Sequence, residues 1–327
     1  MRNNPVLSGL KKIKRSIDLS KYFFEDFNVY NASAFYQTTS HTHENLRAIL
    51  TLNYHAIEKG LSHKNLRLGF GKKALTRLYQ NIVIYNERGF PSDDERYQSA
   101  LSCIDKYIKI HDDKGYDISD IKRMFKPYLV SSYIGEGGTK RILKKDKINN
   151  LNINFKSLAK NRHTIREFSN ERIKLEKIEH VINIALSTPS ACNRQPWRVY
   201  AISDTSYIKK IIEKQGGLKG YQNHPPMLLV ITSDVQYYGG PIERNAAYID
   251  GGLFSMSVLY GLEYEGFAAC TLNASLNLEN EKYIKELVEI KQTEKIIMFI
   301  AVGNMLDEVK VPISTRDKNE SILKYID

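Results

Sequence analysis

Apolar residues follow two different spacings along this chain, and this change of spacing restricts the fold more than any other feature of the sequence. Before about residue 155, apolar side chains recur every three or four residues, which is typical of helices that bury one face. Beyond that point, helical stripes alternate with short runs of β-branched and aromatic residues, which indicate strands. We therefore predict a mainly helical region over residues 1–155 and a second domain, mixed α and β, over residues 156–327.

Three helices are predicted in the helical region. Their apolar stripes are Leu46, Ile49, Leu50 and Ile57; Leu75, Leu78, Ile82 and Tyr85; and Tyr97, Leu101, Ile104 and Ile108. Gly60 is a plausible end for the first helix. Ser92 followed three residues later by Glu95 has the form of a capping box, so we expect Ser92 to begin the third. Residues 135–150, rich in Gly and then in Lys, show little periodicity and predict a linker.

In the second domain the pattern predicts a helix followed by strands. The helix carries the stripe Leu175, Ile178, Ile182 and Ala185, and the strands cover residues 197–202, 227–231 and 296–302. A long apolar stretch over 243–264 predicts a buried helix, although it contains Gly251, Gly252 and Gly261. A glycine costs a helix about 1 kcal/mol relative to alanine, so these glycines indicate close packing against another backbone or a ligand.

The charge is concentrated in the helical region. Of the net charge of +11, residues 1–150 carry +10 and the rest +1. Such a basic half could attract nucleic acid, an anionic membrane surface or an acidic substrate. However, no five like charges are contiguous, which favours a solvated surface. Many aromatic residues of this half occupy core-facing helical positions, so the sequence does not predict the interleaved basic and aromatic surface of a nucleic-acid module.

Sequence features also bear on localisation and metal binding. No run approaches the ~18 apolar residues of a membrane span, and the first thirty residues are too charged for a signal peptide, so we expect a cytoplasmic protein without a membrane span. Cys103, Cys192 and Cys270 are an odd number without metal-like spacing, which indicates reduced thiols and predicts no metal site.

Two polar segments are candidate binding sites. In the first, residues 161–168, Arg162 and Arg166 flank Thr164. Arginine forks, a hydroxyl and backbone amides suit a phosphate, although alone the segment also fits an exposed basic turn. In the second, residues 188–197, two prolines bound a loop that carries Asn193 and Gln195, whose amides suit a flat heterocycle. The alternative for this loop is a plain helix-to-strand connection with a buried Trp.

Together these segments resemble the nitroreductase family of flavoproteins. The family pattern is Arg-x-Ser/Thr-x-Arg/Lys followed about twenty-five residues later by Pro-Ser-x-x-Asn-x-Gln-Pro-Trp, and the second motif matches here at every defined position. Residues 248–252 resemble the Asp-x-Gly/Ala segment of the family's central helix, residues 265–267 its glycine turn, and residues 301–303 its late strand ending in Gly. The resemblance covers about residues 158–327 and leaves residues 1–155 unassigned.

The resemblance implies an α+β fold with a central, mainly antiparallel sheet flanked by helices, and an FMN site between two subunits of a homodimer. Arg162, His163, Thr164 and Arg166 would hold the phosphate and ribityl chain, with Arg316 as a late phosphate contact. The backbone amide of Gly266 or Phe267 would point at the flavin N5. The partner subunit would supply a loop consisting of Pro189, Ser190, Ala191, Asn193 and Gln195.

The implied activity is hydride transfer from NADH or NADPH to FMN, followed by reduction of a small organic acceptor in the same pocket, with no catalytic residue beyond the flavin contacts. A flavin-dependent dehydrogenase or tailoring enzyme of a biosynthetic pathway is one alternative. A protein that binds flavin or an anionic partner without turnover is another. At the variable loop positions, Cys192 is either a small buried filler or a redox-active thiol, and Arg194 faces either an anionic substrate or solvent.

Four histidines occur within 23 residues of the helical region: His41, His43, His55 and His63. Their spacing fits no zinc pattern. His55 and Glu58 lie about one helical turn apart and could line a substrate cavity, and the basic segment 59–67 could contact an anionic substrate. The remaining alternatives are that these histidines hold a metal ion, since neutral imidazoles are common metal ligands, or that all four are ordinary surface or core histidines.

Overall fold

A computed structural model describes residues 5–33, 42–133, 135–145, 154–191, 194–221, 224–238 and 241–326. The chain forms two compact units. Unit 1 consists of Met1–Phe27 and Leu143–Val309, and unit 2 of Asn28–Ile142 and Lys310–Asp327. The expected division into folding domains near residue 155 stays a prediction.

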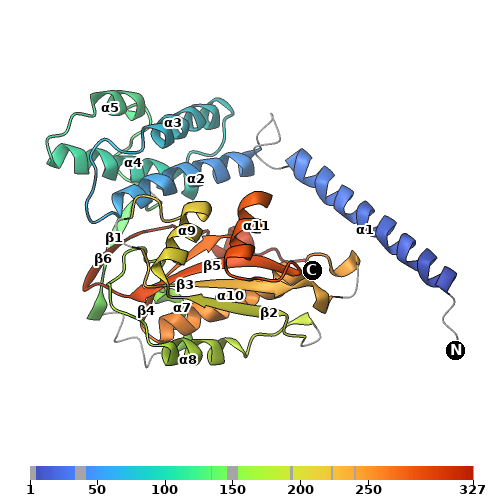
Figure 1. Ribbon diagram of the computed structural model, residues 1–327. Coiled ribbons are helices and arrows are strands. Elements are labelled where there is room, and N and C mark those ends of the chain that lie inside the picture. Colours follow the sequence, from blue (N-terminus) through green and yellow to red (C-terminus); the bar gives the residue numbers. More distant parts are fainter. Residues whose placement is uncertain are drawn as a thin grey trace. The chain divides into compact units, whose positions relative to one another are not determined.

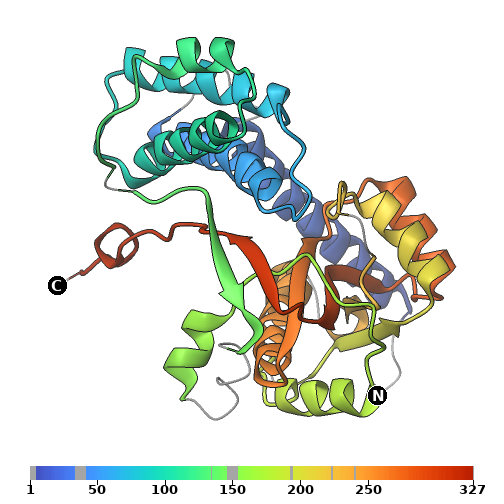
Figure 2. The same cartoon turned by 90° about the vertical axis from the view of Figure 1, so that its left-hand side faces the viewer.

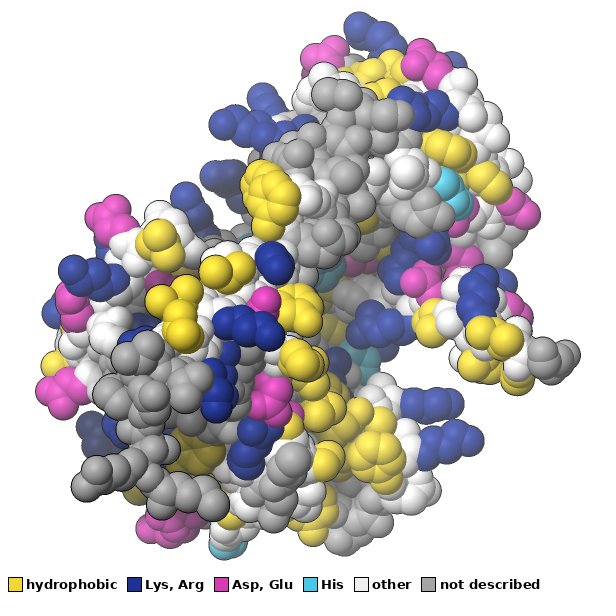
Figure 3. Space-filling model, turned by 90° about the vertical axis from the view of Figure 1, so that its right-hand side faces the viewer, with side chains coloured by type: hydrophobic (Ala, Val, Ile, Leu, Met, Phe, Trp, Pro, Cys, Tyr) yellow, Lys and Arg dark blue, Asp and Glu magenta, His cyan; other side chains and the backbone are white. Residues whose placement is uncertain are grey.

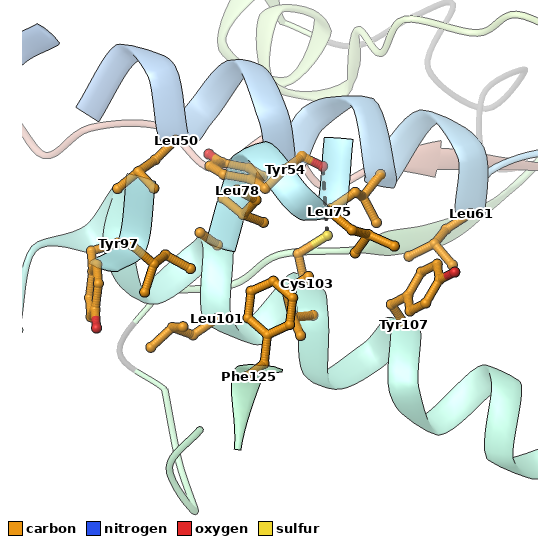
Figure 4. Packing of buried hydrophobic residues seen from close by; sticks show 14 of the residues in the cluster. Leu50, Tyr54, Leu61, Leu75, Leu78, Tyr97, Leu101, Cys103, Tyr107 and Phe125 are labelled. Atoms are coloured by element: carbon orange, nitrogen blue, oxygen red, sulfur yellow. Dashed lines mark hydrogen bonds between the residues drawn. The ribbon is translucent and has the colours of Figure 1, made fainter. Parts of the chain in front are cut away.

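Unit 2 is built on four helices: α2 (His43–Leu61), α3 (Lys72–Glu87), α4 (Glu95–Asp113) and α5 (Ser119–Phe125). The three predicted apolar stripes contribute to one core, so these helix predictions are confirmed. Figure 4 shows side chains from α2, α3 and α4 pointing toward one another, with the Cys103 thiol donating to the Tyr54 carbonyl at 3.7 Å. Burial raises the pKa of this thiol well above its usual value, so Cys103 stays protonated and serves as core packing.

The start of α4 differs from the prediction. The cap is Asp94, whose carboxylate accepts the backbone N–H groups of Arg96 and Tyr97, and not Ser92. A carboxylate also interacts favourably with the positive end of the helix dipole, which a serine hydroxyl does not match. Ser92 instead lies outside the helix and uses its carbonyl to accept the side-chain amide of Gln98.

The tract predicted as a linker contains a strand. Thr139–Leu143 forms β1, which pairs with β6 (Glu308–Pro312) in a two-stranded sheet. The pairing partner lies more than 160 residues away in sequence, so local periodicity could not reveal it. Residues 146–150 of the tract lie outside the described residues. After β6 the chain continues to the short helix α12 (Asn319–Ile322).

Unit 1 contains a four-stranded sheet in the order β2-β3-β5-β4, and all neighbouring pairs are antiparallel. The strands are β2 (Trp197–Ile202), β3 (Met227–Asp234), β4 (Phe267–Asn273) and β5 (Glu294–Asn304). The central, mainly antiparallel sheet is therefore confirmed, and it contains the three predicted strands. The sequence analysis described only the glycine turn before β4 and did not predict that strand.

Helices cover both faces of this sheet (Figures 1 and 2). One layer holds α7 (Phe155–Asn161), α8 (Leu175–Ala185) and α10 (Ala246–Tyr264), and the other holds α9 (Thr205–Gln215) and α11 (Leu278–Leu287). Two short 3-10 turns, Val235–Tyr237 and Pro241–Glu243, lead into α10. The long helix α1 (Pro5–Ser33) begins the described chain. None of the helices in the described ranges is both long and apolar enough to cross a membrane.

The glycines of α10 explain how this helix packs. A Cβ at Gly261 would lie 3.0 Å from the Val181 carbonyl of α8, and one at Gly251 would lie 2.6 Å from Ile297 of β5. Gly261 confirms the predicted close approach to another backbone, whereas Gly251 packs closely against a side chain. A Cβ at Gly252 would meet no atom within 4 Å among the described residues.

The surface charges agree with a solvated basic surface. On the face shown in Figure 3, Lys and Arg side chains are interspersed with acidic, polar and apolar ones and form no continuous basic block.

Candidate functional site

The first candidate segment, residues 161–168, runs alongside the first residues of β4. Thr164 forms a parallel bridge with Ala269, and the Ile165 N–H donates to the Ala269 carbonyl at 2.9 Å. Ile165 is buried, whereas Arg162, Thr164 and Arg166 are partly accessible. The segment is therefore fixed to the sheet by its backbone and by one apolar side chain, and its polar side chains remain available to a ligand.

The end of this segment is held by β5. The Ser169 N–H donates to the Asn304 carbonyl at 2.9 Å, and Phe168 bridges Met305. A Cβ at Gly303 would lie only 2.6 Å from Cβ of Phe168. The strand must therefore have glycine there for the segment to approach so closely, which gives a physical reason for the glycine that ends the Ala-Val-Gly motif.

The glycine turn before β4 lies beside the same segment. Gly266 has φ +77°, a left-handed conformation that favours glycine, and it ends α10. Since Thr164 is level with Ala269 in a parallel pairing, Arg162 is level with Phe267, directly after the turn. The backbone amide of Gly266 or Phe267 was predicted to face the flavin. The Gly266 N–H already donates to the Glu263 carbonyl at the end of α10, at 3.1 Å. The fold thus brings the basic segment and the glycine turn together.

The charges of this segment fit a phosphate. Arg162 and Arg166 make no ion pair with any residue that the structure describes, although both are only partly exposed. Arginine side chains that no described carboxylate neutralises are suited to bind an anionic ligand. His163 is turned to the backbone, with Nδ1 at 2.5 Å from the Asn161 carbonyl.

The second candidate segment is a loop between α8 and β2. Cys192 and Asn193 lie outside the described residues, so their predicted roles stay predictions. On either side of them, the Gln195 N–H donates to Ser190 Oγ at 3.0 Å, and Gln195 has φ +50°, which is uncommon for a residue with a side chain. Pro189 and Gln195 are exposed, and Ser190 and Ala191 are half-buried.

Side chains of α10 hold both ends of this loop. Thr188 Oγ1 donates to Ser257 Oγ at 2.6 Å, and the carboxylate of Asp250 accepts the Ala191 N–H at 3.2 Å. Trp197 is buried and stacks on Phe254 with ring centroids 4.6 Å apart. The buried Trp197 agrees with the alternative of a plain helix-to-strand connection. That alternative did not require the hydrogen bonds that hold the loop to α10.

Arg194 has a partner that the sequence did not predict. Its guanidinium forms a bidentate ion pair with Glu243, with N–O distances of 2.5 and 3.1 Å, and lies 5.0 Å from the centre of the Tyr238 ring. An acidic residue 49 positions later thus neutralises this arginine, and the expectation that it faces a substrate or solvent stays a prediction. Glu243 and Tyr238 carried no sequence signal that could have identified them.

The two candidate segments occupy opposite corners of the sheet. Trp197, after the loop, is level with Ser233 and thus with Lys295 of β5, whereas Phe267 is level with Asn304. Along β5 these two levels are nine residues, or about 30 Å, apart. Across the sheet, β2 and β4 are separated by three strand spacings of about 4.8 Å each. One FMN molecule cannot reach both segments of the same chain.

A cavity of about 500 Å³ adjoins the loop. It lies between α8 and β2 and is lined mainly by apolar residues, with Gln195 at its edge: Leu175, Ile178, Ile182, Leu186, Trp197, Val199, Ala201 and Phe254. This cavity was not predicted from the sequence, although Leu175, Ile178 and Ile182 of its lining belong to the predicted apolar stripe of α8.

Arg316 belongs to unit 2, so its proximity to Arg162 stays a prediction. Its guanidinium donates to the Ser314 carbonyl. The next residue, Asp317, binds Arg47 and Arg96 of the same unit, both at 3.0 Å.

The histidines of the helical region have individual partners. His43 Nε2 lies 2.9 Å from the Tyr85 hydroxyl, and His55 Nδ1 lies 3.1 Å from Glu58 Oε2. Glu58 is fully buried, and its other oxygen accepts the Gly138 N–H at 3.0 Å. His41 lies outside the described residues. Among those described, no three His, Cys, Asp or Glu side chains form a group that could hold a metal ion.

Comparisons with known proteins match the unit that carries both segments. A model of the nitroreductase family matches residues 159–217. Iodotyrosine deiodinase from Nematostella vectensis is 25% identical over 197 residues, covering 52% of this chain and 73% of its own. A putative NADH dehydrogenase/NAD(P)H nitroreductase from Archaeoglobus fulgidus is 24% identical over 147 residues, covering 45% and 83%. A solved structure of a putative NAD(P)H:FMN oxidoreductase from Staphylococcus epidermidis covers 53% of this chain and 96% of its own at 17% identity, with a TM-score of 0.47.

The C-terminal half of this chain therefore contains an oxidoreductase domain of the nitroreductase family. The matched residues include both candidate segments, from before Arg162 to beyond Gln195. The helical region up to residue 142 lies outside this match.

Proposed function

We propose that this protein is an FMN-dependent oxidoreductase that uses NADH or NADPH to reduce a small organic acceptor at a site shared by two copies of the chain. The observation that carries the proposal is the placement of the two motifs at opposite corners of one sheet. In a symmetric homodimer the loop of one copy lies against the basic segment of the other, and each of two equivalent sites is complete.

The residues present fit FMN. In this proposal the phosphate and ribityl chain are bound by Arg162, Arg166 and the Thr164 hydroxyl, and the loop carrying Ser190 and Gln195 contributes amide and hydroxyl groups to the ring system. When bound, FMN supplies the hydride chemistry, while the protein sets its orientation and the access of substrates. We name no acid or base among the side chains, and NAD(P)H and the acceptor use the same site in turn.

Helix α10 supports the second copy as the partner. This helix is apolar all round, which is typical of a helix buried on every side. In the single chain, however, Ile249, Leu253 and Tyr264 remain 61%, 46% and 47% exposed. A second copy packed on this face would bury these side chains.

The test of the shared site is complementation between two defective variants. One chain carries Arg162→Ala and Arg166→Ala, and the other carries Asn193→Ala and Gln195→Ala. Neither should bind FMN tightly alone. After the subunits are mixed and reassembled at random, about a quarter of the sites combine the intact segment of one copy with the intact loop of the other.

The measurement is FMN bound per chain, by absorbance after gel filtration. Recovery of about a quarter of the wild-type amount supports the proposal. Mixtures that bind no more FMN than the separate variants contradict the shared site, and wild-type protein that neither contains nor takes up FMN contradicts the proposed function itself.

The acceptor class to test first is a halogenated phenol, because several relatives are named iodotyrosine deiodinases. The experiment reduces the FMN-loaded protein with NADH or NADPH without oxygen and then adds iodotyrosine, a nitroaromatic or a quinone in separate samples. Iodide release with reoxidation of the flavin supports dehalogenation. Reoxidation by the nitroaromatic or quinone alone favours the general reductase. Failure of both nicotinamides to reduce the flavin favours the dehydrogenase or tailoring alternative.

A further inference from the structure

The loop that carries Ser190 and Gln195 is held by a closed ring of interactions that no family motif contains as a whole. Arg194 folds back on the loop, and its Nε donates to the Ala191 carbonyl at 2.9 Å. Its guanidinium lies over the ring of Tyr238. The Tyr238 hydroxyl donates to Asp250 Oδ2 at 2.9 Å, and the same carboxylate accepts the Ala191 N–H. The ring begins and ends at Ala191.

We propose that Arg194, Tyr238 and Asp250 are positioning residues that hold Ser190, Ala191 and Gln195 in the conformation that receives the flavin. We name this set of three residues the latch. The inference rests on the proposed function, because it assumes that this loop faces FMN.

Burial and charge support the latch. Asp250 is 4% exposed, and a buried carboxylate requires donors, which Ala191 and Tyr238 supply. Burial and the neighbouring Asp250 carboxylate raise the pKa of Tyr238 to about 12, so its hydroxyl keeps the proton that it donates. Glu243 neutralises Arg194, which allows the guanidinium to lie over the aromatic ring instead of in water.

Backbone conformation explains why the loop requires a latch. Gln195 adopts φ +50°, and a residue with a side chain keeps such a conformation only where the surrounding structure enforces it. The Gln195 N–H donates to Ser190 Oγ, so the strained residue is tied to the end of the loop that Asp250 holds. Loss of the Tyr238 hydroxyl should therefore loosen the residues next to the flavin.

The test compares Tyr238→Phe with Tyr237→Phe, which removes the same hydroxyl from the neighbouring residue. Tyr237 accepts a hydrogen bond from Arg198 at 2.8 Å and has no part in the latch. We expect Tyr238→Phe to raise the Kd for FMN about tenfold, and Tyr237→Phe to leave it unchanged. The double variant Tyr238→Phe with Asp250→Asn should have a Kd for FMN no higher than that of whichever single variant binds FMN more weakly. Both substitutions act on one interaction.

A second measurement needs no flavin. Trp197, the single tryptophan of the chain, lies two residues after Gln195, so quenching of its fluorescence by acrylamide reports on the end of the loop. In apo-protein, Tyr238→Phe should increase quenching while Tyr237→Phe does not. Equal Kd values and equal quenching in the two variants would overturn the latch. If wild-type protein binds no FMN, the proposed function fails, and the quenching alone decides whether the network holds the loop.

Discussion

At the scale of single residues, this chain shows that local chemistry selects a role and a distant partner decides whether that role is used. Arg162 and Arg166 form no ion pair with a described carboxylate, and the phosphate-binding role that their spacing suggests stays a prediction. Arg194 has the same side chain, yet Glu243 neutralises it within the fold. Asp94 similarly takes the cap that Ser92 was expected to form, because two backbone N–H groups point at its carboxylate.

Replacement of Arg166 by alanine should weaken FMN binding at least about tenfold, since a charge-assisted contact to phosphate is lost. Binding should also become less sensitive to salt. Isothermal titration of apo-protein with FMN at two salt concentrations measures both effects. Arg172→Ala, an exposed arginine beyond the segment, is the control. Equal losses in the two variants would count against a phosphate role for Arg166.

Asp317→Asn should lower the free energy of unfolding of unit 2 by about 1–2 kcal/mol, because Arg47 and Arg96 lose a charged acceptor. The hydrogen bond from Arg96 is the main cause that lowers the pKa of Asp317 in the folded protein. The stabilisation is therefore complete above the unfolded-state pKa of about 4 and is lost as pH falls through the lower folded value. Urea unfolding at pH 7 and at pH 3 tests this.

The control for that prediction is Asp120→Asn, which breaks an exposed pair with Arg123. It should change stability by less than about 0.5 kcal/mol at either pH. A difference between Asp317→Asn and wild type that is unchanged at pH 3 would show that charge is not the cause.

At the scale of elements, the sequence predicted those helices and strands whose own apolar residues follow a clear periodic spacing. Helices α2, α3, α4, α8 and α10 and strands β2, β3 and β5 were visible because each buries one face or lies in the core. The strands β1, β4 and β6 were missed. Residues 139–143 are half-exposed and polar, and they form a strand only because β6 supplies hydrogen-bond partners.

The glycines of α10 allow a prediction with a matched control inside one helix. Gly251→Ala should destabilise unit 1 by about 1–3 kcal/mol, because its Cβ would lie 2.6 Å from Ile297. Gly252→Ala meets no atom within 4 Å among the described residues, so helix propensity predicts a gain of up to about 1 kcal/mol. Denaturant unfolding of both variants measures this. Similar losses in the two would mean that a partner covers Gly252.

At the scale of the whole molecule, chain connectivity decides which segments stabilise each other. The residues after β6 belong to the helical unit, where Thr315 Oγ1 donates to the Glu136 carbonyl and Lys318 pairs with Glu95 at 3.1 Å. The two chain segments that form this unit are therefore more than 160 residues apart in sequence, and local sequence patterns could not predict that they pack together.

Removal of residues 313–327 should destabilise the helical unit, since the contacts of Thr315, Asp317 and Lys318 are lost together. A chain that ends at Lys318 retains these contacts and is the control. Thermal unfolding followed by circular dichroism, with limited proteolysis of residues 43–125, should separate the two. Identical melting and identical cleavage would contradict a stabilising role for this segment.

The sequence by itself determined the fold class and the family of the C-terminal half, because repeated apolar spacing and a motif of defined residues need only local order. Tertiary structure alone decided that Arg194 is neutralised by Glu243, that β1 is a strand, and that the two flavin motifs lie at opposite corners of one sheet. Each of these outcomes depends on which distant groups the packed chain brings within hydrogen-bond reach. Contacts between residues far apart in the sequence do not produce a periodic sequence pattern, so the sequence could not predict them.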